Sequence, residues 1–144
     1  MSRRFEELRV GDALPPADKA PITTTQLVQY AGASGDFNRI HFDEPFARDG
    51  GFPSVIAHGM LSMAFFGQLV AEWAGGPQAI VRLQTRFKAV TFPGERIRVG
   101  GEVVARDDAA RTVELKLVAQ KPDGTVTLEG AATVRFPQAR RPLP

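Results

Sequence analysis

A carboxylate and an imidazole stand close together in a polar stretch of the sequence. Asp36 and His41 are five positions apart in the run Ser-Gly-Asp-Phe-Asn-Arg-Ile-His. A regular strand would place side chains at this odd separation on opposite faces, whereas irregular backbone lets them converge on one point. Such a pair can take a proton from a reacting group and return one, because imidazole titrates near neutral pH. Asp36 is also a common turn residue and His41 can pack locally, so the spacing alone leaves both interpretations open.

A second polar position, His58 followed by Gly59, precedes a long apolar segment. If that segment is a helix, its first N–H groups and the positive end of its dipole gather at Gly59, which suits a developing negative charge on an oxygen. Gly59 also has no side chain to block the approach of a ligand atom. A glycine that lets the chain turn tightly into the helix is the alternative interpretation.

A helix and a polar loop are expected to position the first pair. Thr23 with Gln26 fits a capping box, and the apolar residues that follow predict a helix that ends near residues 32–35. Residues 34–54 are rich in Gly, Asp, Asn and Pro and predict a long irregular segment with one helical turn near residues 44–47. A segment of this length without regular structure is more often functional than idle.

The rest of the chain predicts the fold. Phe5 to Leu14 predicts a short strand or arm. From Gly59 to about Ala74, apolar residues cover most of the circumference of a helix, which requires enclosure by other structure. Stretches rich in β-branched residues and separated by turn signals predict four strands, over residues 79–92, 96–106, 112–120 and 125–136. Joined by short turns, they form an antiparallel meander. We therefore expect an α+β hot-dog fold, an antiparallel sheet wrapped around a central apolar helix.

The bulk composition argues against several classes of protein. The 144 residues suit a single domain, expected over residues 1–144 with a core of about 5–136. No apolar run approaches roughly 20 residues, and no apolar stretch follows the first arginines, so we expect a cytoplasmic protein without a membrane segment. The chain has no cysteine and only two histidines, His41 and His58, so no metal site is expected. A net charge of +2 with dispersed arginines argues against nucleic-acid binding.

Three motifs, in order along nearly the whole chain, give the sequence a family resemblance. The run Tyr-Ala-Gly-Ala-Ser-Gly-Asp-Phe-Asn-Arg-Ile-His, from Tyr30 to His41, resembles the signature of the MaoC-like hydratases, the R-specific enoyl-CoA hydratases. Ile-Ala-His-Gly-Met-Leu at residues 56–61 resembles the start of their central helix. Phe-Lys-Ala-Val and Phe-Pro-Gly-Glu, within residues 87–95, look like the following strand–turn–strand, although thioesterases share this turn. Residues 31–90 most resemble the catalytic subunit of the mycobacterial-type (3R)-hydroxyacyl-ACP dehydratases.

The resemblance implies roles for individual residues. Asp36 and His41 match the catalytic acid–base dyad, and Gly59 matches the glycine whose N–H binds the thioester oxygen. The residues expected to contact or position the substrate are Asn38, which shapes the loop, His58, Ser62, and Phe66, which could line an apolar acyl tunnel or simply pack in the core.

The sequence departs from the family pattern at two positions. The family commonly has proline where this chain has Arg39, which predicts a less rigid and more electropositive loop. Some members carry a serine on the central helix that assists the dyad, but this chain has Gly67 at the matching position. Ser62 is nearby and is a candidate for the same role.

The resemblance implies a hydro-lyase that interconverts trans-2-enoyl and (R)-3-hydroxyacyl thioesters of CoA or an acyl carrier protein, without a metal or organic cofactor. Hot-dog domains usually pair edge to edge, so we expect a homodimer, with a heterodimer as the alternative. One rival function is an acyl-chain-binding partner subunit of a heterodimeric dehydratase, although such subunits lack the dyad. The other is a hot-dog thioesterase, which places a carboxylate on or next to the central helix, whereas residues 59–70 here contain no Asp or Glu.

Overall fold

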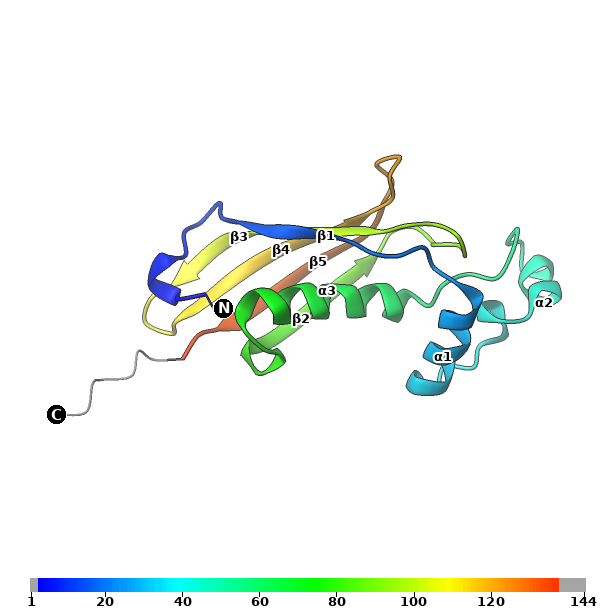
Figure 1. Ribbon diagram of the computed structural model, residues 1–144, viewed down its shortest axis with the longest axis horizontal. Helices are drawn as coiled ribbons and strands as arrows, with labels where there is room; N and C mark the ends of the chain where they lie inside the picture. The colour runs from blue at the N-terminus through cyan, green and yellow to red at the C-terminus, as the bar shows by residue number, and fades with distance from the viewer. Residues whose placement is uncertain (1–2, 138–144) are drawn as a thin grey trace.

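The computed structural model describes residues 3–137, which form one antiparallel sheet packed on a long helix (Figure 1). The strands are β1 (Ala13–Asp18), β2 (Ile80–Phe87), β3 (Arg98–Asp107), β4 (Thr112–Gln120) and β5 (Val126–Arg135). The helices are α1 (Thr24–Ser34), α2 (Glu44–Asp49) and α3 (Gly59–Ala74), with short 3₁₀ turns at Phe5–Glu7, Arg39–His41 and Pro77–Ala79. Helix α3 runs along one face of the sheet, and α1 and α2 lie beyond its N-terminal end. The predicted hot-dog fold is confirmed, while the predicted domain also takes in residues 1–2 and 138–144, outside the described part.

The order of the strands corrects the predicted meander. The sheet runs β1-β3-β4-β5-β2, so only β3, β4 and β5 follow one another as neighbours. Strand β2 pairs with β5 instead of β3, because residues 88–97 leave the sheet and do not form a tight turn. In this connection the carbonyl of Thr91 accepts a hydrogen bond from Ala57 N at 2.8 Å, and Gly94 N donates to Ile22 O at 2.7 Å. The connection therefore ties β2 to the segments that precede α1 and α3.

The first strand lies later than predicted. Residues 5–7 form a 3₁₀ turn, and β1 begins at Ala13 and includes Pro15 and Pro16. Strand β1 is at the edge of the sheet and pairs only with β3, with an irregular register between Leu14 and Ala17. An edge strand tolerates proline, because the N–H that proline lacks can face away from the neighbouring strand.

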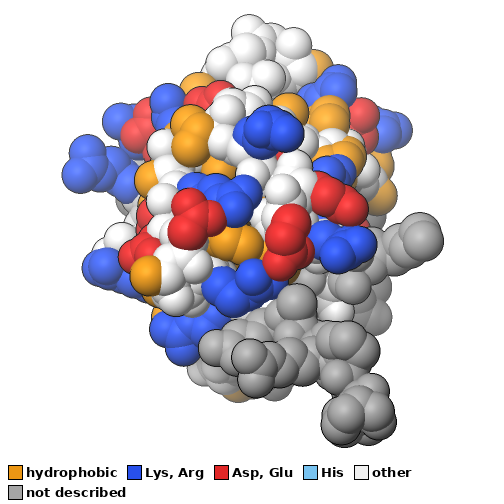
Figure 2. Space-filling view, turned by 90° about the vertical axis from the view of Figure 1, so that its left-hand side faces the viewer, with side chains coloured by type: hydrophobic (Ala, Val, Ile, Leu, Met, Phe, Trp, Pro, Cys, Tyr) orange, Lys and Arg blue, Asp and Glu red, His pale blue; other side chains and the backbone are white. Residues whose placement is uncertain are grey.

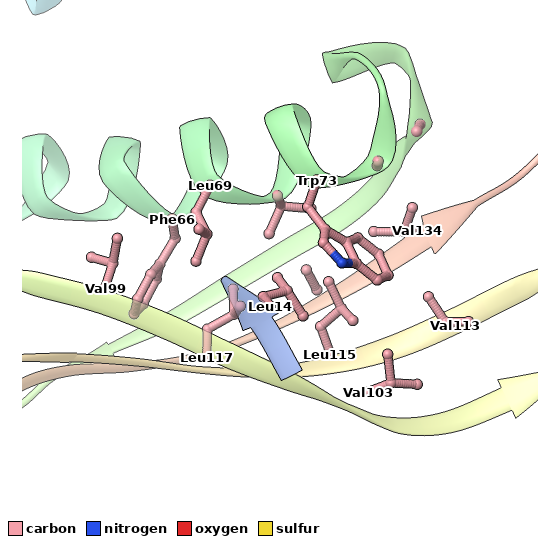
Figure 3. Packing of buried hydrophobic residues seen from close by; sticks show 14 of the residues in the cluster. Leu14, Phe66, Leu69, Trp73, Val99, Val103, Val113, Leu115, Leu117 and Val134 are labelled. Atoms are coloured by element: carbon pink, nitrogen blue, oxygen red, sulfur yellow. The ribbon is translucent and has the colours of Figure 1, made fainter. Parts of the chain in front are cut away.

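Helix α3 packs on the sheet with one side and leaves the other open. Phe66, Leu69 and Trp73 point from the helix into the core (Figure 3). They meet buried residues of the strands, namely Leu14, Val99, Val103, Val113, Leu115, Leu117 and Val134. On the opposite side Met60 is 52% exposed and Ala64 is also exposed. Within a single chain, the sheet covers one side of α3 as predicted. The side that faces away from the sheet, called the away-facing side below, is not enclosed, so the prediction is wrong there.

The first helix has the predicted ends. The Oγ1 of Thr23 accepts a hydrogen bond from Gln26 N at 3.1 Å, and Gly35 ends the helix in the left-handed conformation. Asp43 caps α2, which at six residues is longer than the predicted single turn. A second, smaller core holds α1 and α2 in place and consists of Ile22, Leu27, Ala47, Val55, Ala57 and Leu61. This core fixes both ends of the polar segment between residues 34 and 54.

No helix within residues 3–137 has the length and apolar character needed to cross a bilayer. Figure 2 shows the end of the molecule opposite α1 and α2, where Lys and Arg side chains alternate with Asp and Glu side chains. Among the described residues, ion pairs join Arg106 to Asp108 and Arg111 to Glu6. On the visible face neither sign of charge forms a continuous patch.

Candidate active site

Two consecutive turns fold the polar segment back toward α1. The side chain of Asp36 accepts a hydrogen bond from Asn38 N at 3.2 Å, and that of Asn38 accepts one from Ile40 N at 3.2 Å. Both are local bonds of the kind that Asp and Asn make to backbone two residues ahead. Ser34 Oγ also accepts a hydrogen bond from Asp36 N at 3.2 Å, which joins the turns to the end of α1. As a result, His41 comes back beside Asp36.

The ring of His41 has one defined orientation. Its Nδ1 lies 2.8 Å from the carbonyl oxygen of Ile56, and the side chain is buried. A carbonyl can only accept a hydrogen bond, so Nδ1 carries the proton and Nε2 presents a lone pair. This Nε2 lies 3.7 Å from Oδ2 of Asp36, whose side chain is 48% exposed. The two atoms are too far apart for a strong direct hydrogen bond, but both can contact the same small oxygen-containing molecule.

A second imidazole lies directly behind the first. His58 is 1% exposed, and its ring stacks on that of His41 with centroids 3.7 Å apart. Its Nε2 donates a hydrogen bond to the backbone oxygen of Asp36 at 3.2 Å, and Tyr30 meets the ring edge-on. Burial lowers the pKa of His58 below 6.5, and the nearby His41 acts in the same direction, while the hydrogen bond to Asp36 opposes the shift. The ring is therefore neutral at pH 7.

A cavity of about 330 Å³ opens between His41 and the first turn of α3, within the size range of small-molecule sites, roughly 300–1,000 Å³. Its lining is mostly apolar and consists of His41, Ile56, Ala57, Gly59, Ser62, Phe87, Lys88, Ala89, Val90, Thr91 and Leu128. Within the described chain no side chain caps the start of α3, so its first N–H groups keep their hydrogen-bonding capacity. A Cβ atom on Gly59 would lie 2.7 Å from the ring of Phe87. Close approach of this ring therefore requires glycine at the cavity wall.

Residues 6–128 match the family model of the MaoC like domain. This chain belongs to the MaoC-like domain family. It is 33% identical over 139 residues to the "(R)-specific enoyl-CoA hydratase" of Rhodospirillum rubrum, covering 92% of this chain and 91% of that protein. It is 37% identical over 118 residues to the "3-hydroxyacyl-thioester dehydratase X" of Mycobacterium tuberculosis, covering 81% of this chain and 40% of that protein.

The fold agrees with this assignment. The solved structure of the (R)-hydratase from A. caviae, described as involved in PHA biosynthesis, superposes with a TM-score of 0.83 at 26% identity, covering 92% of this chain and 99% of that chain. The predicted family resemblance is thereby confirmed. In this MaoC-like domain the run between Tyr30 and His41, from which the resemblance was drawn, forms the end of α1 and the double turn that follows it.

The structure gathers most of the predicted site residues of this MaoC-like domain, but not all. His41, Gly59 and Ser62 line the same cavity, whereas Asp36 is not among the lining residues but has its carboxylate 3.7 Å from Nε2 of His41. His58 does not line the cavity and lies behind His41 instead. The side-chain oxygen of Asn38 is used within the loop, where it caps the 3₁₀ turn.

The structure differs from the expected roles of Phe66 and Arg39. Phe66 is 0% exposed and belongs to the main core, so the structure does not bring it to the cavity. Arg39, which was expected to make the loop electropositive, pairs with Asp43 at 2.6 Å and lies over the ring of Phe46. This guanidinium holds the pKa of the Asp43 carboxyl below its usual value, so the two charges largely compensate each other.

Sequence reasoning missed two parts of the cavity. The carbonyl of Ile56, which orients His41, is a backbone group, and no residue type signals it. Phe87 and Val90 form one wall and are partly exposed. The signal available in the sequence was the motif at residues 87–90, in which a phenylalanine is followed by a lysine.

The dyad and His58 together also offer metal-ligand atoms. One atom from each of Asp36, His41 and His58 lies within 4.8 Å of the others. A metal ion lies in the plane of each imidazole that binds it, along the nitrogen lone pair. The two rings are stacked at 21° and Nδ1 of His41 and Nε2 of His58 already bond to carbonyls, so they do not direct their lone pairs at one point. This MaoC-like domain therefore has the residue types of a metal site without the geometry of a chelate.

Proposed function

We propose that this chain is a hydro-lyase that interconverts trans-2-enoyl and (R)-3-hydroxyacyl thioesters. The observation that carries the proposal is Nε2 of His41, a residue that lines the cavity, at 3.7 Å from the carboxylate of Asp36. Membership of the MaoC-like family supports it, since relatives with 33% and 32% identity over more than 90% of this chain bear the names of an enoyl-CoA hydratase and a 3-hydroxybutyryl-CoA dehydratase.

In the proposed hydration, one water molecule binds between Asp36 and His41. Nε2 of His41 takes a proton from this water while its oxygen attacks Cβ of the enoyl thioester. The electron pair of the double bond moves toward the thioester oxygen, and the resulting enolate takes a proton at Cα from the dyad. Dehydration is the same path in reverse. Positioned acid–base catalysis of this kind contributes roughly 10²–10⁴-fold to a rate, and none of the steps requires a metal or an organic cofactor.

Gly59 is the proposed donor to the enolate oxygen. It begins α3, where the free N–H groups and the positive end of the helix dipole lie together. Because Gly59 lines the same cavity as His41, its N–H and the imidazole can act on one bound thioester. A single donor of this kind contributes about 3 kcal/mol of transition-state stabilisation in other enzymes.

The cavity walls suit the two ends of an acyl thioester. Phe87, Val90 and Leu128 supply apolar surface for the acyl group. Lys88 also lines the cavity, with its side chain 42% exposed, and can meet the phosphates of CoA or of a carrier protein's phosphopantetheine arm. Its weak pairing with Glu129, at 3.7 Å, leaves this ammonium available.

We further propose that the chain works as a homodimer in the cytoplasm, with a related hot-dog chain as the alternative partner. The away-facing side of α3, with Met60 52% exposed, and the outer edge of β2, with Val81 51% exposed, support a second chain on this side. Burying such apolar surface is the main driving force for association. Light scattering of the purified protein measures the mass directly, and a strictly monomeric, active protein would contradict this proposal.

The decisive experiment follows the conjugated-enoyl absorbance of crotonyl-CoA and then octenoyl-CoA. Rapid loss of absorbance that disappears in Asp36→Asn supports the hydro-lyase. Loss that persists unchanged in Asp36→Asn contradicts the assignment of the dyad. Release of free thiol without prior hydration identifies a thioesterase instead. No reaction with CoA esters, but reaction with the same acyl groups on a carrier protein, assigns the carrier protein as the handle.

A further inference from the structure

His58 is a histidine at a position where packing alone would favour another residue. It is 1% exposed, its Nδ1 has no hydrogen-bond partner among the described residues, and it supplies no side-chain cap to α3. A phenylalanine would fill the same space without a buried unpartnered nitrogen. The polar groups of this ring therefore need an explanation beyond filling the core.

The contacts of His58 supply that explanation. Its Nε2–H donates to the backbone carbonyl of Asp36, 22 residues earlier, at 3.2 Å. The face of its ring lies against the face of His41, with centroids 3.7 Å apart and planes at 21°. Its backbone lies next to Gly59 at the start of α3. A single residue at the start of α3 thus contacts two groups of the polar loop, the backbone of Asp36 and the ring of His41, which lie 22 and 17 residues earlier in the chain.

We propose that His58 is a positioning residue, which sets the distance and the angle between Asp36 and His41 through its hydrogen bond to one and its stacked ring on the other. This inference rests on the hydro-lyase function proposed above. The side chain of Asp36 is half-exposed and its own turn is local, so the bond from His58 attaches Asp36 itself to the start of α3, while the His41 end of the loop is attached through Ile56. Misplacing catalytic groups by about 1 Å can cost on the order of 10²-fold in rate.

The neutral state of His58 is part of this role. The titratable groups that face its ring are His41, Asp36 and Tyr30. Burial lowers the pKa of His58, so this ring stays uncharged when His41 takes up a proton. A second charge in the stack would oppose that proton transfer, because like charges at such short range repel each other.

Two amide substitutions separate positioning from packing. The amide nitrogen of glutamine reaches the place of the histidine Nε2, whereas that of asparagine reaches only the place of Nδ1. We expect His58→Asn to lower kcat by about 10²-fold with KM changed less than about threefold, and His58→Gln to recover at least about tenfold of that loss. Equal activity of the two variants, high or low, would overturn the proposal. Val134→Ala, a truncation in the distant main core, is the control for loss of stability without loss of alignment.

A measurement on the unaltered protein decides the question even if the variants fold poorly. The ¹⁵N chemical shifts of the imidazole nitrogens report which nitrogen carries the proton. We expect His58 to be neutral at pH 7 with its proton on Nε2, and we expect Nδ1 of His41 to carry a proton. A charged His58, or one protonated on Nδ1, would overturn the proposed contacts. Because no substrate is present, this result stands apart from the enoyl-thioester assay, whose failure would reject the proposed function instead.

Discussion

The carbonyl oxygen of Ile56 lies 2.8 Å from Nδ1 of His41, and this bond assigns the free lone pair to the nitrogen that faces Asp36. The backbone N–H of Ile56 also donates a hydrogen bond to the carbonyl of Ile40, the residue before His41, at 3.0 Å. The segment before α3 and the segment before His41 are thus held together on both sides of the imidazole. Because the ring is fixed by backbone, changes at its nitrogens should alter chemistry more than structure.

Replacing His41 with alanine should therefore remove activity and leave the fold intact. Loss of the base should lower kcat/KM by about 10²–10⁴-fold, the usual contribution of a positioned acid–base group. Turnover of crotonyl-CoA measures the loss, and the circular dichroism spectrum checks the fold. Activity close to that of the unaltered protein would rule out His41 as the base.

Gly59→Ala should weaken the enzyme because of a clash with Phe87. The added Cβ would lie 2.7 Å from the ring of Phe87, which is half-exposed and can move only by changing the cavity wall. We expect kcat/KM to fall at least roughly tenfold, because displacing groups at a site by about 1 Å can cost on the order of 10²-fold in rate. Adding Phe87→Ala to the same chain should restore part of the activity. A double variant no better than the single one would show that the ring is not the obstacle.

The stability of the protein should fall in mildly acidic solution because of His58. The unfolded chain protonates this histidine near pH 6.5, whereas burial keeps the pKa lower in the folded chain. The unfolded state then binds more protons, so the free energy of unfolding decreases as the pH falls from about 6.5 toward the folded pKa. Urea unfolding at several pH values measures this slope. His58→Phe should show a flatter dependence, and an unchanged slope in that variant would assign the effect to another group.

Phe66→Ala distinguishes core packing from contact with the acyl chain. The ring of Phe66 is fully buried and so close to Gly130 that a Cβ there would lie 2.8 Å from it. We expect a loss of about 3–5 kcal/mol in the free energy of unfolding, as for other buried phenylalanines. At temperatures where the variant is folded, the KM values for short and long enoyl chains should both stay near their original values. A selective change in the long-chain KM would instead place this side chain in the acyl tunnel.

Arg106→Ala should destabilise the end of the molecule remote from the cavity. Its guanidinium donates to the backbone oxygens of Phe5 and Leu8 and lies 4.1 Å from the ring centroid of Phe5. Hydrogen bonds from a charged donor contribute about 1.5–3 kcal/mol, so a loss of that order is expected in urea unfolding, with no change in kcat. Arg98→Ala is the matched control, because its exposed pairing with Asp18 at 3.8 Å should contribute less than about 1 kcal/mol. Equal losses in the two variants would contradict this difference.

Local sequence signals predicted most of the elements, and interactions between distant segments account for the errors. The cap at Thr23 and the span of α3 depend on residues within one helix, and both were confirmed. The placement of β2 beside β5 was missed, because it depends on the path of residues 88–97 across the molecule. The predicted first strand ended at Leu14, before Pro15 and Pro16. The edge position of β1 lets the strand continue through these prolines.

The candidate site divides in the same way. Asp36, His41 and Gly59 were predicted from residue type and a family motif, and the fold places His41 and Gly59 in one cavity lining with Asp36 beside His41. The hydrogen bond of His58 is made to the backbone carbonyl of Asp36. Every residue has a backbone carbonyl, so the sequence gives no sign of this contact. Only the three-dimensional structure distinguishes the carbonyl that matters.

The two prolines of β1 also set a limit on self-association. The sheet has two outer edges, β1 and β2, and because successive N–H groups of a strand point to opposite sides, Pro15 and Pro16 remove one N–H donor from the open side of β1. A further strand therefore finds fewer hydrogen-bond donors along β1 than along β2. If two chains join through their β2 edges, both open edges are used at once and the outer borders of the joined sheet are the two proline-bearing strands. In such a pair the remaining outer edges would be the ones with fewer donors, which disfavours further growth of the sheet.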